Sequence, residues 1–287
     1  MKHMSEDNIL FPDGRIAPMS DIEFGQIVEY MHSGYGIELK DKRTVVAGRL
    51  DGKMSGLGYG NYSDIIREIK NNPGGKTAKI FVDILTTNYT FFMREFEHFE
   101  FWKDKVLPGL RTRLAGTRDL RVWCAAASTG EEPYTIQMIL NDYFGNDDLE
   151  WDMGILATDI SVQSLQTAVR GIYPTESLSG LPFGWRERYF KRLDRDSFQV
   201  VDNIRKQITF SRFNLMDKFL FKKKMHTVFI RNVMIYFDNN TKVQLLKKLY
   251  DILEPGGYMF IGMTESIDSE RTGFEYVRPA VYRKPLI

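Results

Sequence analysis

The sequence predicts a doubly wound α/β domain that is preceded by a small all-α domain. From about residue 120 onward, short apolar runs alternate with helical patterns, whereas about the first 85 residues show helical patterns alone. The runs are continuously apolar, which is typical of parallel strands buried on both faces of a sheet. At 287 residues with 43% hydrophobic side chains, the chain is long enough to bury one large core or two smaller ones.

The N-terminal region is expected to be helical because its apolar residues recur at three- to four-residue spacing. One such stretch covers residues 21–30 behind Ser20, a favourable N-cap, and another covers residues 62–69 before a turn at residues 71–75. Between them, residues 39–50 form a basic stripe of helical period. The cations of this stripe either face water or dock a partner, and the sequence favours neither alternative.

The C-terminal region is expected to contain four parallel strands separated by helices. The strands are predicted at residues 120–126, 153–158, 227–230 and 258–262, and the helices at residues 133–143, 162–170 and 241–253. Two further apolar stretches, residues 198–201 and 207–210, are predicted to form a hairpin inserted into this domain. In a doubly wound sheet, ligands bind beyond the carboxyl ends of the strands.

The charge and cysteine content exclude several classes of protein. The 39 basic and 38 acidic side chains leave a net charge of +1, which argues against a generic polyanion binder. Within this balance, residues 121–185 carry 2 basic and 9 acidic side chains, and residues 186–224 carry 12 and 5. A single cysteine, four scattered histidines and the lack of an apolar run of roughly 18 residues predict a cytoplasmic protein without a disulfide, a structural zinc site or membrane insertion.

The turn after the first predicted strand is a candidate ligand site. Residues 125–130 are small or turn-forming, and Glu131 and Glu132 open the next helix. Small side chains let the backbone approach a ligand closely, but two acids at a helix start oppose a phosphate and favour a cationic ligand. The alternative is a tight turn whose acids only complement the helix dipole.

Asp159, at the end of the second predicted strand, narrows the choice of ligand. An acid at this position can accept hydrogen bonds from both ribose hydroxyls of an adenosine, or it can cap the following helix. Together with the acidic turn, it indicates an adenosyl ligand without phosphates. The candidate is S-adenosylmethionine.

Five sequence blocks together resemble one known family. The blocks are TNYTFFMRE at residues 87–95, VWCAAASTGEEPY at 122–134, ATDI at 157–160, FNL at 213–215 and RNVMIYF at 231–237. From about Ser20 to its C-terminus, the chain resembles the chemotaxis receptor glutamate methyltransferases of the CheR type. The resemblance implies a class I methyltransferase domain with an inserted small β-subdomain, S-adenosylmethionine as cofactor and S-adenosylhomocysteine as product. It also implies that the substrates are specific glutamate side chains of methyl-accepting chemotaxis receptors.

The resemblance implies roles for individual residues. The residues expected to bind the cofactor are Asn88, Thr90, Arg94, Glu131, Asp159, Asn214, Leu215, Asn232 and Val233. At the Gly130 turn, the resemblance favours Glu131 over Glu132 as the acid that contacts the cofactor. Arg94 and Tyr236 are expected beside the transferred methyl group as the catalytic residues. No metal is expected.

The residue types suit this reaction. A glutamate with an ordinary pKa of about 4.3 is ionised at pH 7, so its carboxylate can attack a methyl group without a general base. Arg94 and Tyr236 can orient that carboxylate by hydrogen bonds. The alternatives are that Arg94 only braces the linker by pairing with Glu95 or Glu97, and that Tyr236 is only a core aromatic residue.

The expected partner is the cytoplasmic domain of the receptors. Some members of the family bind a C-terminal receptor pentapeptide through a glycine-containing loop of the β-subdomain, but the corresponding residues 191–198 contain no glycine. We therefore expect that this protein does not bind a receptor pentapeptide tether. We also expect a cytoplasmic protein that is recruited to membrane receptor arrays and has no nucleic-acid partner. Two alternatives are a non-catalytic cofactor-binding module of the receptor array and a methyltransferase of another acceptor.

The expected domain boundaries follow from the patterns and from the resemblance. We expect a flexible N-terminal segment at residues 1–18, a helical domain at 19–85, a linker with a connecting helix at 86–118, and the methyltransferase domain at 119–287 with its β-subdomain at about 171–212. The β-subdomain carries much of the basic excess of residues 186–224.

Overall fold

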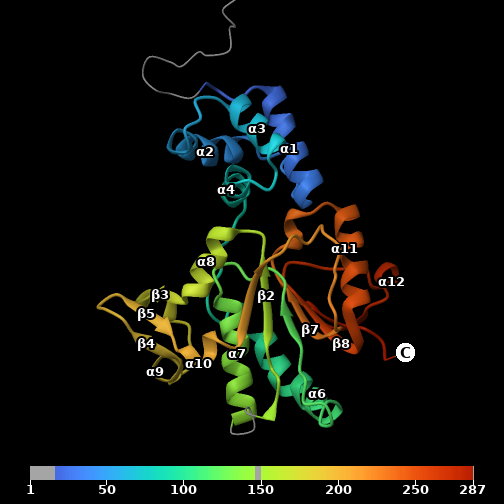
Figure 1. The fold of residues 1–287 in the computed structure, drawn as a ribbon. Helices are drawn as coiled ribbons and strands as arrows, with labels where there is room; N and C mark the ends of the chain where they lie inside the picture. Colours follow the sequence, from blue (N-terminus) through green and yellow to red (C-terminus); the bar gives the residue numbers. More distant parts are fainter. Residues whose placement is uncertain (1–16, 146–149, 287) are drawn as a thin grey trace, which may run out of the picture. The chain divides into compact units, whose positions relative to one another are not determined.

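The computed structural model describes residues 17–145 and 150–286 and divides into two compact units. The first unit is Met1–Thr87 and the second is Asn88–Ile287 (Figure 1). Most of the segment expected to be flexible, residues 1–18, lies outside the described residues. No helix within the two described ranges combines the length and the apolar character needed to cross a membrane.

The described part of the first unit is helical, as predicted. It contains α1 (Asp21–Tyr35), α2 (Arg43–Met54), a 3-10 turn (Ser55–Leu57), α3 (Tyr62–Asn71) and α4 (Lys76–Leu85). Ser20 caps α1 in a capping box, because its side chain accepts from the Glu23 N–H and the Glu23 carboxylate accepts from the Ser20 N–H. Asn61 caps α3. Helix α2 begins at Arg43, so residues 39–42 of the predicted basic stripe precede the helix.

The second unit is built on a seven-stranded sheet. Its strands are β1 (Val122–Cys124), β2 (Ile155–Asp159), β6 (Ile208–Arg212), β7 (Met225–Ile230), β8 (Leu253–Ile261), β9 (Glu275–Arg278) and β10 (Val281–Arg283). The spatial order is β6-β2-β1-β7-β8-β10-β9, in which β6 to β8 are parallel and β10 is antiparallel to both of its neighbours. The predicted α/β class, with an open and mostly parallel sheet, is confirmed.

Helices cover both faces of this sheet. They are α5 (Glu97–Phe101), a π-helical turn (Trp102–Val106), α6 (Leu107–Arg113), α7 (Glu131–Phe144), α8 (Val162–Arg170), α11 (Asn239–Ile252) and α12 (Ser269–Thr272). In Figure 1, α7 and α11 lie on opposite sides of β2, β7 and β8. Trp102 packs edge-on against Phe229 of β7. The ring of Trp123 in β1 packs against a different pair of rings, those of Phe219 and Phe221. The strands are therefore buried on both faces, which explains their continuously apolar sequences.

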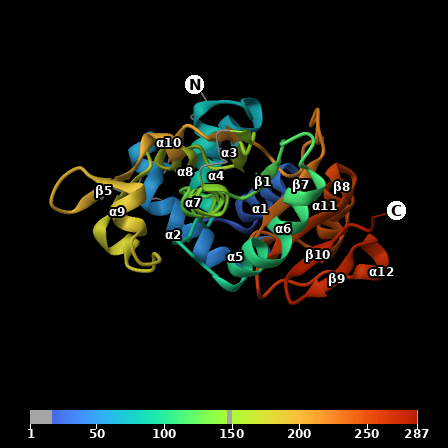
Figure 2. The same ribbon diagram turned by 90° about the horizontal axis from the view of Figure 1, so that it is seen from below.

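The inserted subdomain contains a second, three-stranded sheet. Its elements are β3 (Ile172–Pro174), a 3-10 turn (Thr175–Leu178), α9 (Trp185–Tyr189), β4 (Phe190–Arg192), β5 (Ser197–Val200) and α10 (Asp202–Arg205). The strand order is β3-β5-β4, with antiparallel pairing throughout. Figure 2 shows this sheet at one end of the unit and β9 and β10 at the other.

The predicted hairpin between residues 198–201 and 207–210 is wrong. Strand β5 pairs with β3 and β4, whereas β6 leaves the subdomain and pairs in parallel with β2, up to Arg212 opposite Asp159. The reason is the connection: residues 202–205 form α10, and its fully buried Ile204 anchors it to the core. A helical turn in place of a hairpin turn directs the chain to the edge of the main sheet.

Candidate active site

The turn between β1 and α7 brings the backbone close to α8. Gly130 caps α7 with φ +102°, a conformation that favours glycine. A Cβ atom at this position would lie 2.8 Å from the Ala168 Cβ and 2.9 Å from the Tyr173 hydroxyl oxygen. The Tyr173 hydroxyl donates to the Thr129 carbonyl at 2.7 Å. Only glycine therefore fits, and the turn keeps its backbone N–H groups at the carboxyl end of the sheet.

Asp159 is fixed beside this turn. Its side chain is 7% exposed, and its two carboxylate oxygens accept from the Ser128 N–H at 2.7 Å and the Ser161 N–H at 2.9 Å. Ser128 adopts φ +49°, which aims its N–H at this carboxylate. The N-cap of α8 is Ser161, whose hydroxyl accepts from the Ser164 N–H at 3.0 Å. The capping role considered for Asp159 therefore belongs to Ser161.

The two acids that open α7 point to different partners. Glu131 accepts from the Thr129 hydroxyl at 2.6 Å and is 7% exposed. Burial raises the pKa of Glu131 despite this hydrogen bond. Glu132 instead accepts from the Cys124 thiol at 3.0 Å and from Arg231 Nη1 at 2.5 Å. Glu132 is therefore engaged in an internal network, whereas Glu131 is held at the turn.

Arg231 is the centre of that network and had no role in the sequence predictions. It directly follows β7, its side chain is 1% exposed, and its Nη2 atom lies 3.2 Å from a carboxylate oxygen of Glu95. It also donates to the Arg94 carbonyl. We call Arg231, Glu95, Glu132 and Asn232 the Arg231 network, since their side chains join the linker block, the start of α7 and the end of β7.

Glu95 is the second carboxylate of the Arg231 network. It accepts from Asn232 Nδ2 at 3.0 Å and from the Met263 N–H at 3.1 Å. Burial disfavours the charged form of Glu95, but hydrogen bonds from Asn232 and Arg231 outweigh burial and lower its pKa. Glu95 is therefore an anion paired with Arg231, and the alternative that it pairs with Arg94 is wrong.

Arg94 has a different environment. Its Nη1 atom donates to the Tyr89 carbonyl at 2.8 Å, and its guanidinium carbon lies 5.8 Å from the centroid of the Tyr89 ring. Arg94 makes no ion pair with any carboxylate in the part of the chain that the structure describes, Glu97 included. Its positive charge is thus not neutralised, in contrast to that of Arg231.

The predicted residues after β7 are held by Glu265, which sequence reasoning missed. Its carboxylate accepts from the backbone N–H groups of Asn232 at 2.9 Å, Ile235 at 3.1 Å and Gly262 at 2.5 Å. Burial raises the pKa of Glu265, although these hydrogen bonds favour the charged form and act in the opposite direction. Asn232 has φ +57°, and the Tyr236 N–H donates to the Val233 carbonyl at 3.2 Å within the 3-10 turn Met234–Tyr236. No pattern around residue 265 had indicated this role.

The predicted adenine-flanking residues lie next to Asp159. Strand β6 pairs with β2, and the Phe213 N–H donates to the Asp159 carbonyl at 3.0 Å. Asn214 then accepts from the Met216 N–H at 3.0 Å, and Leu215 is buried. Lys248 Nζ donates to the carbonyls of Leu215 and Met216, both at 2.9 Å, which holds this loop in place.

The two remaining predicted residues belong to the linker block. The Asn88 carbonyl accepts from the Ser128 hydroxyl at 2.7 Å, which attaches the block to the β1–α7 turn. Thr90 is partly exposed and makes no hydrogen bond with another described side chain. Hydrogen bonds thus connect Asn88, Ser128 and Asp159 in one group, and they connect the Arg94 backbone to the Arg231 network in another.

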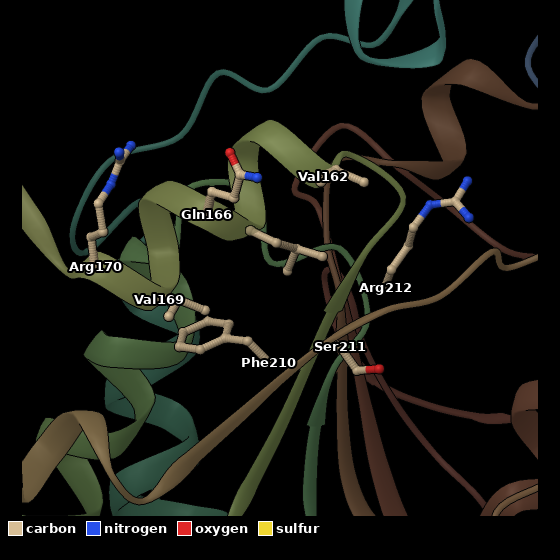
Figure 3. Close-up of a pocket in the computed structure, with 8 residues that line it drawn as sticks. Val162, Gln166, Val169, Arg170, Phe210, Ser211 and Arg212 are labelled. Carbon is tan, nitrogen blue, oxygen red and sulfur yellow. The ribbon is translucent and has the colours of Figure 1, made fainter. Parts of the chain in front are cut away.

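A separate groove lies between α8 and β6. It has a volume of about 420 Å³ and is lined by Val162, Leu165, Gln166, Val169, Arg170, Phe210, Ser211 and Arg212. Figure 3 shows Val169 and Phe210 facing each other across it, with Arg170 and Arg212 to either side. None of the predicted site residues lines this groove, so it is distinct from the two connected groups at the carboxyl ends of β1, β2 and β7.

Comparison with known proteins gives a consistent result. The family model described as CheR methyltransferase, SAM binding domain, matches residues 88–282. A chemotaxis protein methyltransferase of Borreliella burgdorferi is 36% identical over 266 residues, which cover 91% of this chain and 94% of that protein. The chemotaxis protein methyltransferase of Escherichia coli is 33% identical over 269 residues, which cover 92% of this chain and 91% of that protein.

Proposed function

The chain belongs to the CheR methyltransferase family and contains its S-adenosylmethionine-binding domain, and from this premise we propose that it methylates glutamate side chains of methyl-accepting chemotaxis receptors. The observation that carries this proposal is the contrast between two arginines. Arg231 is neutralised by Glu95 and Glu132, whereas Arg94 has no carboxylate partner among the described residues. A half-buried guanidinium without a carboxylate partner suits an incoming carboxylate.

The residues present fit S-adenosylmethionine. Gly130 lets the turn approach a ligand closely, since any side chain there would collide with Ala168 and Tyr173. Two backbone N–H groups fix the Asp159 carboxylate in the orientation that would accept from ribose hydroxyls. Glu131 is a buried acid whose raised pKa reflects the cost of an uncompensated charge, and a bound ammonium group would offset that cost.

We infer that the remaining predicted residues complete the cofactor site. The segments that would contact the cofactor are Asn88 and Thr90 from the linker block, Asn214 and Leu215 beside the adenine, and Asn232 and Val233 beneath the methionine part. Glu265 and Lys248 would support the last two segments, through their hydrogen bonds to the Asn232 N–H and the Leu215 carbonyl. Of the two acids at the α7 start, Glu131 is the proposed cofactor ligand because Glu132 is engaged with Arg231.

Methyl transfer needs orientation more than proton transfer. When bound, S-adenosylmethionine supplies an electrophilic methyl group on a sulfonium; a glutamate oxygen takes that methyl as an ester, and the sulfur keeps the electron pair as S-adenosylhomocysteine. An ionised glutamate gives up no proton in this step. Arg94 would orient the carboxylate of the substrate glutamate by charge-assisted hydrogen bonds, and Tyr236 would hold that carboxylate from a second side.

The proposed partner is the cytoplasmic domain of the receptors. We propose that the enzyme acts at membrane receptor arrays from the cytoplasm and without a pentapeptide tether. The β4–β5 loop supports the second point, since Asp194 accepts from the Ser197 hydroxyl at 2.7 Å and from the Asp196 N–H at 2.9 Å within the loop itself.

One experiment separates this proposal from its alternatives. The protein is incubated with tritium-labelled S-adenosylmethionine and receptor-bearing membranes, and radioactivity released by base as methanol is counted. Base-labile label is the expected result, because methyl esters hydrolyse in base. Base-stable label would indicate another acceptor, and no label from a protein that binds the cofactor would indicate a non-catalytic module.

A further inference from the structure

The carboxylate of Glu265 joins two loops at the carboxyl end of the main sheet. Strands β7 and β8 pair in parallel up to their last residues, so the loops that follow them leave the sheet side by side. Glu265 belongs to the loop after β8, and its side chain is buried. It accepts from the Gly262 N–H of its own loop at 2.5 Å, and from the N–H groups of Asn232 at 2.9 Å and Ile235 at 3.1 Å in the other loop.

The two hydrogen bonds to the loop after β7 hold opposite ends of one turn. Asn232 opens the turn with φ +57°, and the Tyr236 N–H donates to the Val233 carbonyl at 3.2 Å near its end. Oε2 of Glu265 accepts at the first end, from Asn232, and Oε1 accepts at the second end, from Ile235. The turn therefore carries a proposed cofactor ligand and a proposed catalytic side chain, and one carboxylate fixes the backbone at both ends.

The loop after β8 fits closely around this carboxylate. A Cβ atom at Gly262 would lie 2.9 Å from both the Asn232 backbone nitrogen and Oε2 of Glu265, so any side chain there would displace one of them. Glu95 adds a second connection between the loops, since it accepts from Asn232 Nδ2 at 3.0 Å and from the Met263 N–H at 3.1 Å. The backbone and the side chain of Asn232 are thus held by two different carboxylates.

The three hydrogen bonds require a carboxylate at position 265. Each of the three partners is an N–H donor, and an ionised carboxylate can accept on both of its oxygens. A glutamine has one acceptor oxygen, and its NH₂ group would face at least one of the three donors. The geometry of the turn therefore depends on the carboxylate itself and not only on the size of the side chain.

We propose that Glu265 is a positioning residue for methyl transfer, because it sets the position of Tyr236 relative to the cofactor-facing end of the same turn. This inference rests on the proposed function. Methyl transfer depends on the alignment of two bound groups, and a misplacement of about 1 Å can lower the rate of such a reaction by about 100-fold. Glu265 would act only through the backbone of this turn, without contact with the donor or the acceptor.

A double-mutant cycle tests this inference, with a purified receptor cytoplasmic domain as the acceptor. Glu265→Gln should lower kcat by roughly 10- to 100-fold, because the turn loses its geometry, while the S-adenosylhomocysteine Kd should change by less than about threefold. In a Tyr236→Phe background, the same substitution should lower kcat by less than about twofold, since no hydroxyl is left to position.

Asp268→Asn is the matched control for this cycle. Asp268 lies in the same region of the chain as Glu265 and also accepts from a backbone N–H, that of Arg271 at 3.1 Å, but it caps α12 and is exposed. Asparagine is an equally good N-cap, so this variant should match the wild type in kcat and in the S-adenosylhomocysteine Kd.

Several results would overturn the inference. They are additive losses of kcat in the cycle, an unchanged kcat in Glu265→Gln or in Tyr236→Phe, and a rise in the S-adenosylhomocysteine Kd as large as the loss of kcat. If Glu265→Gln does not fold, Gly262→Ala replaces it in the cycle with the same expectations, because the added methyl group would displace the same carboxylate. A wild-type protein that forms no methyl ester at all would instead contradict the proposed function.

Discussion

The Nη1 atom of Arg231 lies 2.5 Å from Oε2 of Glu132, in an ion pair whose side chains are only 1% and 12% exposed. The same guanidinium pairs with Glu95 and donates to the Arg94 carbonyl. One buried cation therefore fixes the start of α7, where Glu131 lies, relative to the backbone of Arg94. Because both groups belong to the proposed site, the Arg231 network connects the stability of the second unit to its function.

Arg231→Met should destabilise the protein strongly. It leaves Glu95 and Glu132 partly buried without their cation, a change that typically costs about 3–5 kcal/mol of unfolding free energy. The control is Arg186→Met, which breaks an exposed pair with Glu187 and should change the unfolding free energy by less than about 1 kcal/mol. Urea denaturation measures both, and similar values for the two variants would contradict a structural role for the network.

Arg94→Ala should reduce transfer far more than cofactor binding. Loss of the group that orients the carboxylate should lower kcat/KM by about 100-fold, while the S-adenosylmethionine Kd measured by calorimetry should change only slightly. Arg278, which also stacks on an aromatic ring, that of Phe101, provides the control variant Arg278→Ala. Equal losses of transfer and of cofactor affinity would reassign Arg94 as a cofactor ligand.

Asp159→Asn should weaken cofactor binding, and because an amide nitrogen cannot accept, it also loses one of the two backbone hydrogen bonds that fix this side chain. Removing a charged acceptor of ribose hydroxyls should raise the Kd of S-adenosylhomocysteine by roughly 10- to 100-fold. Asp152→Asn is the control, because Asp152 is exposed and precedes the same strand at its opposite end. An unchanged Kd in Asp159→Asn would exclude Asp159 from the cofactor site.

Cofactor affinity should fall as the pH falls, and Glu131 should be responsible. Burial raises the pKa of Glu131 above its ordinary value, so this carboxyl binds a proton at a higher pH than an ordinary glutamate. The protonated form no longer attracts an ammonium group, so the Kd should increase as the pH drops through this raised pKa. Glu131→Gln should bind the cofactor more weakly than the wild type, and its Kd should depend less on pH. A Kd that changes with pH in parallel with the wild type would rule out Glu131 as the titrating group.

A receptor C-terminal pentapeptide should not bind. The β4–β5 loop has no glycine and is held by the internal hydrogen bonds of Asp194. Calorimetric titration with micromolar pentapeptide should give no heat of binding, and receptors with and without that tail should be methylated at the same rate. Saturable binding of the peptide would contradict the prediction.

Most of the sheet could be predicted because each central strand is apolar on both faces. The strands predicted at residues 153–158, 227–230 and 258–262 correspond to β2, β7 and β8, with ends that differ by a few residues. The partner of residues 207–210 could not be predicted, since an edge strand of the main sheet and a hairpin strand have the same local pattern. Only the helical turn α10, anchored by Ile204, decides between them.

Only part of the site could be predicted from the sequence. What could not be predicted is how the buried charged side chains pair with one another and with the backbone. Glu95 was considered as a partner for Arg94, but its carboxylate pairs with Arg231, 136 residues later in the chain. Glu265 likewise accepts from the backbone N–H groups of Asn232 and Ile235, which lie 33 and 30 residues earlier in the chain. Such contacts depend on how remote segments meet in the fold, and no local pattern encodes them. The position of Arg231, directly after a buried apolar run, was the one available signal.

The most direct test of the central claim is to map the methyl group on the acceptor. A receptor cytoplasmic domain is incubated with the enzyme and S-adenosylmethionine and then analysed by tandem mass spectrometry before and after mild base. We predict that glutamate side chains gain the mass of one methylene group, that base removes it, and that Arg94→Ala forms far less of it in the same reaction time. A base-stable methyl group on nitrogen, or an unmodified acceptor in the presence of enzyme that binds the cofactor, would contradict glutamate methylation by this protein.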